Sequence, residues 1–195
     1  MKKISYMELA NLAENSRCEI WNIAKQYGRE PKIYLHWSAG HYGSFFDDYH
    51  INIDSDGSIY ISTSDFTETL AHTYRRNTGS IGISLACCYN GRSDNLGNEP
   101  PTDAQIEAMA RCIAIIAQKW WLTVRIQNVM THGEAADNKD GWYAHEPYGP
   151  ETTCERWDLA ILRNGDVWCS GGDTLRGKAA WYQRTYPDGV EYHFD

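Results

Sequence analysis

MTHGEAA, residues 130–136, opens the segment around which the chain is organised, and CERWDL, residues 154–159, closes it. The residues just before it, 125–129, alternate, which is typical of a half-buried strand. His132 is therefore expected just past the end of a strand, where a side chain can face a cleft. A second histidine, His36, closes the short apolar run 33–35 in the same way.

Two strand-end histidines and a downstream carboxylate form the ligand set of a catalytic zinc that keeps one position for water. His36 and His132 stand above the other histidines because their contexts match. For the third ligand, Asp158 competes with Cys154, since zinc accepts either a carboxylate oxygen or a thiolate sulfur. Asp158 could equally begin a helix without binding any metal, so the residues alone leave these alternatives open.

Composition bounds the class of protein. The chain has 195 residues, of which 42% are hydrophobic and 23% charged, and this suits one globular domain over residues 1–195. A net charge of -8 argues against nucleic acid or an anionic membrane as the main partner. No apolar run approaches a membrane span, so no membrane insertion is expected.

The amino terminus and the cysteines bear on location. Glu8, Asn11 and Glu14 interrupt the apolar stretch that a signal peptide would need. The six cysteines contain no Cys-x-x-Cys pair and are too sparse for a disulfide framework. We expect a protein that is synthesised in the cytoplasm without a signal peptide and with reduced thiols.

The periodicities predict an α/β fold, in which a central mixed β-sheet is flanked by helices on both faces. The division expected is an N-terminal helix at about 5–27, a core at about 32–160 and a C-terminal cap at about 161–195. Thr102 is placed as the N-cap of a long helix. The elements expected after the first helix are strands at 33–36, 49–53, 58–62, 80–86 and 124–131, helices at 103–120 and 175–182, and a tail that forms a strand or an irregular cap.

Several ordered motifs give the chain a family resemblance. They are LHWSAG (35–40), YHINIDSDGSIY (49–60), AHT (71–73) with Asn77 and SIGI (80–83), PTDAQ (101–105) and HGE (132–134). Together they resemble the zinc-dependent N-acetylmuramoyl-L-alanine amidases, the type 2 amidase and peptidoglycan recognition protein family, which includes bacteriophage lytic enzymes. The resemblance spans roughly residues 33–159.

The resemblance implies a ligand set. His36 and His132 would bind zinc, with Asp158 as the third ligand, because the family places a basic residue two positions before its last ligand and Arg156 stands there. The stretch TTC (152–154) is similar to an alternative form of that motif and keeps Cys154 as the second choice. Two departures stand out, since Arg156 replaces the commoner Lys and Ser84 stands where some intracellular members carry a catalytic Glu.

The resemblance also implies roles. Zinc lowers the pKa of water from about 16 toward roughly 7 and polarises the amide carbonyl between muramic acid and L-alanine. Arg156 suits the oxyanion, and Tyr49 could hydrogen-bond the attacking water or the oxyanion. Glu134 could shuttle a proton or, more simply, help to orient a zinc ligand. The residues expected to line the groove for glycan and stem peptide are Trp37, His72, Asn77, Trp142 and Tyr148.

The function expected is that of an endolysin-like, phage-type lytic enzyme that acts on the bacterial cell wall after release. Its partner would be peptidoglycan and its cofactor Zn²⁺, and the oligomeric state is left open with a monomer as the expectation. The alternatives are a peptidoglycan-binding module without activity and an intracellular amidase that recycles muropeptides. The complete ligand set favours an enzyme, and Ser84 favours the lytic role over the recycling one.

Overall fold

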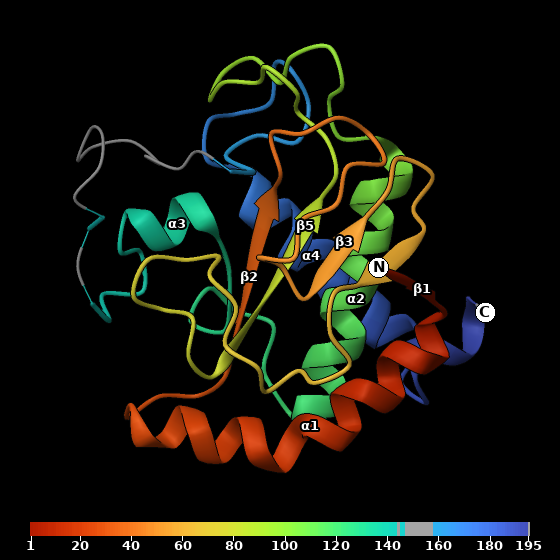
Figure 1. The fold of residues 1–195 in the computed structure, drawn as a ribbon, viewed down its shortest axis with the longest axis vertical. Coiled ribbons are helices and arrows are strands. Elements are labelled where there is room, and N and C mark those ends of the chain that lie inside the picture. The colour runs from red at the N-terminus through yellow and green to blue at the C-terminus, as the bar shows by residue number, and fades with distance from the viewer. Residues whose placement is uncertain (144, 147–157, 195) are drawn as a thin grey trace.

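The computed structural model describes residues 1–143, 145–146 and 158–194 (Figure 1). A six-stranded sheet forms its centre, with the strand order β1-β4-β3-β5-β2-β6. The pairs β2–β5, β2–β6 and β3–β5 are parallel, whereas β1–β4 and β3–β4 are antiparallel. The strands are β1 (Lys2–Ile4), β2 (Lys32–Trp37), β3 (Ile51–Ile53), β4 (Ile59–Ile61), β5 (Ser80–Leu85) and β6 (Val129–Thr131). The expected mixed sheet of an α/β fold is thus confirmed.

Local sequence explains where the long helices begin. α1 (Tyr6–Gln26) starts with a capping box between Ser5 and Glu8, and α2 (Asp103–Trp120) starts with one between Thr102 and Gln105. In each box a side chain satisfies a backbone N–H that the first helical turn leaves unpaired. The remaining elements are α3 (His132–Ala136), α4 (Gly171–Thr185) and the 3-10 helix η1 (Val190–His193).

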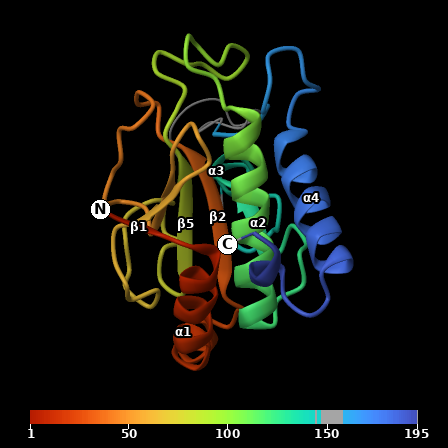
Figure 2. The ribbon, with the colours of Figure 1, turned by 90° about the vertical axis from the view of Figure 1, so that its right-hand side faces the viewer.

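The two faces of the sheet have different roles. Because side chains alternate along a strand, Ile33 and Leu35 of β2 point into the main apolar core with α2, whereas Tyr34 belongs to a second, smaller cluster with Ala135 of α3. Figure 2 shows α2 beside the sheet and α4 on the outer side of α2. Helices therefore lie on both faces, as expected. The face of Ile33 and Leu35 packs against α2, whereas the face of Tyr34 is covered by the short helix α3 and by loops.

Some boundaries differ from expectation. The strand expected at 124–131 is reduced to β6, because the backbone turns at Arg125, whose carbonyl accepts hydrogen bonds from the N–H groups of Asn128 and Val129. β1 was not expected; it pairs with β4 at the edge of the sheet. The tail forms η1 instead of a strand, and α4 extends beyond the expected 175–182 at both ends.

In the part of the chain that the structure describes, no helix combines the length and apolar content that crossing a membrane requires.

Candidate active site

Strand register brings the two predicted histidines together. β2 and β6 are parallel neighbours in which Leu35 lies opposite Thr131, so His36 and His132 follow at the same edge of the sheet. Thr131 also caps α3: its hydroxyl accepts the N–H of Glu134, and the Glu134 carboxylate accepts the N–H of Thr131. This capping box turns the chain directly after the strand and fixes the backbone of His132.

Asp158 completes a three-residue cluster, which we call the His–His–Asp cluster. Its Oδ2 lies 3.1 Å from Nδ1 of His36 and 3.3 Å from Nδ1 of His132. One candidate ligand atom from each residue lies within 4.8 Å of the other two. Two imidazole nitrogens and one carboxylate oxygen that converge on a point are a donor set that zinc accepts, so the residues fit the metal that the resemblance implied.

The protonation of His36 and Asp158 suits a cation, whereas His132 holds a proton at neutral pH. Burial lowers the pKa of His36 to about 4, so its ring is neutral at pH 7. Burial also disfavours charge on His132, but hydrogen bonds to Asp158 and Glu146 outweigh this effect and raise its pKa to about 9. Burial favours the neutral acid of Asp158, whereas its two histidine partners hold the pKa of the carboxyl below its usual value. His132 would have to give up this proton to hold a metal, because metals bind neutral imidazole.

Each histidine makes a further contact through its other ring nitrogen. Nε2 of His36 lies 3.4 Å from the hydroxyl of Thr73, and that hydroxyl lies 2.9 Å from Nδ1 of His72. Nε2 of His132 lies 2.9 Å from Oε1 of Glu146. Both rings are therefore fixed from behind, one by a neutral hydroxyl and the other by a carboxylate.

A pocket of about 720 Å³ opens over the cluster, and His132 and Asp158 form part of its lining. It brings together four of the residues that sequence predicted for the reaction or the groove, which are Trp37, Tyr49, His72 and Asn77. The other lining residues are Ser38, Ala39, Asp48, Ala71, Thr73, Tyr74, Arg75, Gly91 and Glu146. A pocket of this size can hold a segment of a larger substrate.

Tyr49 lies beside the cluster and lines the pocket. Its ring centroid lies 5.0 Å from that of His36. Burial and the nearby charge of Asp158 raise the pKa of Tyr49, although a hydrogen bond with Ser84 acts in the opposite direction. The phenol is therefore protonated at neutral pH and can donate a hydrogen bond.

Two predicted residues lie elsewhere. Glu134 is absent from the pocket lining; besides capping α3, its carboxylate forms two 2.7 Å contacts with the Arg176 guanidinium of α4. This geometry favours a structural role over proton transfer. Trp142 is not in the pocket lining either, because its ring packs against the guanidinium groups of Arg29 and Arg76, 5.1 and 5.5 Å from their carbon atoms.

Three further predicted residues, Tyr148, Cys154 and Arg156, lie outside the described residues. Sequence reasoning in turn missed Glu146 and Arg75, and it quoted Thr73 only as part of a motif. Glu146 follows a polar, aromatic-rich segment without any repeating pattern, so no signal in the sequence marked it. Thr73 and Arg75 are loop residues that the fold brings to the pocket, where Thr73 also contacts His36.

The buried His36, the partly exposed His132 and a carboxylate beside an open pocket define a candidate metal centre of the kind that hydrolases use. A family model described as N-acetylmuramoyl-L-alanine amidase matches residues 11–156, well over half of the chain. The chain belongs to this amidase family, and membership supports an amidase that acts on peptidoglycan.

Solved structures give more distant likenesses. The endolysin N-acetylmuramoyl-L-alanine amidase LysCS from Clostridium intestinale is 18% identical, with a TM-score of 0.40, over 55% of this chain and 72% of its own. Drosophila peptidoglycan recognition protein LB is 21% identical, with a TM-score of 0.41, over 54% of this chain and 71% of its own. Among curated proteins, none matches the chain.

Proposed function

We propose that the chain is a zinc-dependent N-acetylmuramoyl-L-alanine amidase, which hydrolyses the amide bond between N-acetylmuramic acid and L-alanine. The observation that carries the proposal is the His–His–Asp cluster, in which both Nδ1 atoms face one oxygen of Asp158 at 3.1 and 3.3 Å. His132 and Asp158 of this cluster line the pocket that a glycan with its stem peptide would enter. The match of residues 11–156 to the amidase family supports the same reaction.

Each of the site's side chains has a distinct role in the proposed reaction. His36, His132 and Asp158 would hold the zinc, which when bound supplies a Lewis acid for the amide carbonyl and lowers the pKa of water. The protonated phenol of Tyr49 donates a hydrogen bond to the oxygen of the attacked carbonyl, where negative charge develops. His72 and Asn77 shape the pocket wall, since Asn77 Oδ1 accepts the backbone N–H groups of His72 and Thr73.

Arg156 enters this proposal from the resemblance alone. A guanidinium keeps its charge at any physiological pH and offers planar donors, which suits the same developing oxyanion. The phage-type lytic role, the release to the cell wall after synthesis in the cytoplasm, and the single catalytic domain over 1–195 likewise stay proposals. The lytic role is supported by Ser84, which lies opposite His36 in the sheet where a recycling enzyme of the family would carry Glu.

Digestion of intact bacterial sacculi tests the activity. The expected products carry new N-terminal L-alanine without new reducing sugar ends, and a chelator or His132→Ala stops their release. New reducing ends would instead identify a glycosidase, which needs a pair of carboxylates at the scissile bond. Wall binding without any products would contradict the proposal and support a recognition module.

A further inference from the structure

Glu146 is the one buried carboxylate among the described residues that lines the pocket without belonging to the His–His–Asp cluster or to its expected chemistry. Glu146 as a whole residue is 7% exposed, and its side chain alone is 3% exposed. A carboxylate this deeply buried needs a charged or hydrogen-bonding partner. Its Oε1 lies 2.9 Å from Nε2 of His132.

This contact selects one form of the imidazole ring. A carboxylate only accepts hydrogen bonds, so Nε2 of His132 must carry the proton that it donates to Glu146. When the ring is neutral, the lone pair then lies on Nδ1, the nitrogen that faces Asp158 at 3.3 Å. Glu146 thereby presents the correct nitrogen of His132 to a metal, and the proximity of its negative charge strengthens electron donation by that ring.

The support of the other histidine is weaker. Nε2 of His36 faces the neutral hydroxyl of Thr73 at 3.4 Å, compared with 2.9 Å between His132 and a carboxylate. Hydrogen bonds to an ionised acceptor are shorter and roughly twice as strong as bonds between neutral groups. The hydrogen bond that orients His132 is therefore stronger than the one that orients His36.

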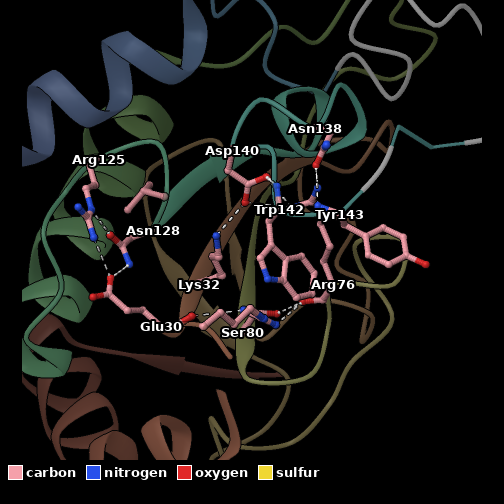
Figure 3. Close-up of polar contacts among 12 residues, drawn as sticks. Glu30, Lys32, Arg76, Ser80, Arg125, Asn128, Asn138, Asp140, Trp142 and Tyr143 are labelled. Atoms are coloured by element: carbon pink, nitrogen blue, oxygen red, sulfur yellow. Dashed lines mark hydrogen bonds and ion pairs between the residues drawn. The ribbon is translucent and has the colours of Figure 1, made fainter. Parts of the chain in front are cut away.

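The segment that carries Glu146 is itself anchored. The Glu146 N–H donates to the carbonyl of Ala136 at the end of α3, over 2.9 Å. Farther back, Asp140 forms ion pairs with Lys32 at 2.8 Å and with Arg76 at 3.0 Å, all three side chains being at most 6% exposed (Figure 3). A carboxylate on a segment held at two points is kept in place before any metal binds.

We propose that Glu146 is a positioning residue, which orients His132 for zinc through a hydrogen bond from Nε2 and so sets the affinity of the centre. This inference rests on the proposed zinc site and adds a residue that the family resemblance did not supply. Loss of such a partner typically lowers metal affinity by about 10- to 100-fold. In this role Glu146 acts on the metal centre through His132.

Zinc affinity, measured without reference to activity, tests the role. Metal-free protein competes with a chromogenic zinc chelator of known affinity, in the wild type and in Glu146→Ala and Glu146→Gln. The control is Glu99→Gln, because Glu99 forms a carboxylate–imidazole pair of the same kind with His41, at 2.7 Å and far more exposed. Glu146→Ala should bind zinc about 10- to 100-fold more weakly, Glu146→Gln about tenfold more weakly, and Glu99→Gln like the wild type.

Thermal unfolding of the metal-free variants separates loss of ligand orientation from loss of fold. If Glu146→Ala fails to fold, Glu146→Gln, which keeps the size and one acceptor oxygen, decides the outcome. Zinc affinity within about twofold of the wild type in every folded Glu146 variant overturns the inference while leaving the proposed amidase intact. A wild type that binds no zinc at all overturns the zinc site itself, and with it the inference.

Discussion

Gly82 of β5 shows how one missing side chain can position another. A Cβ at this residue would lie 2.7 Å from Cγ of His72, closer than real Cβ atoms come to their neighbours. The His72 ring therefore packs directly against the strand. From that position its Nδ1 reaches the hydroxyl of Thr73, the group behind His36. Glycine is required here by space.

We predict that Gly82→Ala destabilises the protein by about 1–3 kcal/mol, the usual cost of overpacking a core, and reduces amidase activity by displacing His72. Urea unfolding measures the first effect and release of N-terminal L-alanine the second. The matched control is Gly177→Ala in α4, where an added Cβ meets nothing within 4 Å. That change should stabilise by about 0.5–1 kcal/mol, because alanine favours a helix interior, and should leave activity unchanged. A Gly82→Ala protein as stable as the wild type would contradict this account.

The segment between α3 and Glu146 is held against β2 by buried charges. Asp140 accepts from Lys32 of β2 and from Arg76, and the same Arg76 also bonds to Asn138 (Figure 3). Burial favours the neutral acid of Asp140, but the hydrogen bond from Lys32 and the charges of Lys32 and Arg76 outweigh this effect and hold its pKa below the usual 3.8. The carboxylate thus joins the segment to the sheet and to the loop that carries Thr73.

Asp140→Asn leaves two buried cations without their carboxylate, so we expect a loss of about 3–5 kcal/mol in unfolding free energy at pH 7. Because the folded-state pKa is lowered, the advantage of Asp140 over Asn is complete above about pH 5 and disappears as the pH falls through the folded-state pKa. Urea unfolding between pH 7 and pH 3 measures both. Glu14→Gln is the control, since Glu14 also faces two cations, at 3.9 and 3.7 Å, but is 51% exposed and should matter little. A pH-independent difference between Asp140 and Asn would refute the linkage.

Elements with a strong local pattern were predictable. α2 begins after Thr102 and ends at Trp120, as the capping residue and the apolar stripe indicated. The run 124–131 misled because its alternation continues through the turn at Arg125, and local pattern cannot reveal that Arg125 and Asn128 both bond to Glu30. β1 escaped notice because three residues are too few for a periodicity.

At the scale of the molecule, the site residues also divide into those that the sequence could predict and those that it could not. His36, His132 and Asp158 could be predicted because strand ends and a family motif mark them, and the structure brings these three together. Glu146 could not, because its role arises from the fold of a segment without periodicity. Trp142 was expected in the groove as a loop aromatic, but Arg29 and Arg76 lie against its ring instead, and sequence gives no sign of that contact.

The three cluster residues come from separate parts of the chain, which links metal binding to the stability of the whole molecule. His36 lies in β2, His132 begins α3, and Asp158 lies between α3 and α4. A ligand that binds only the folded protein stabilises it by about 4.1 kcal/mol at 1,000 times its dissociation constant. For a chain of this length, that corresponds to a rise in Tm of roughly 10 °C.

We therefore predict that zinc at such an excess raises the Tm of the metal-free wild type by roughly 10 °C, as measured by scanning calorimetry, and that a chelator reverses the rise. Asp158→Ala removes one of the three proposed ligands and should abolish most of the rise in Tm. Cys154→Ser should keep the rise, because Oδ2 of Asp158 lies 3.1 and 3.3 Å from Nδ1 of His36 and His132 and can serve as the third ligand atom. The opposite result, with the rise lost in Cys154→Ser and kept in Asp158→Ala, would assign the third position to the thiolate. Asp158 would then act only as a hydrogen-bond acceptor that orients the two histidines.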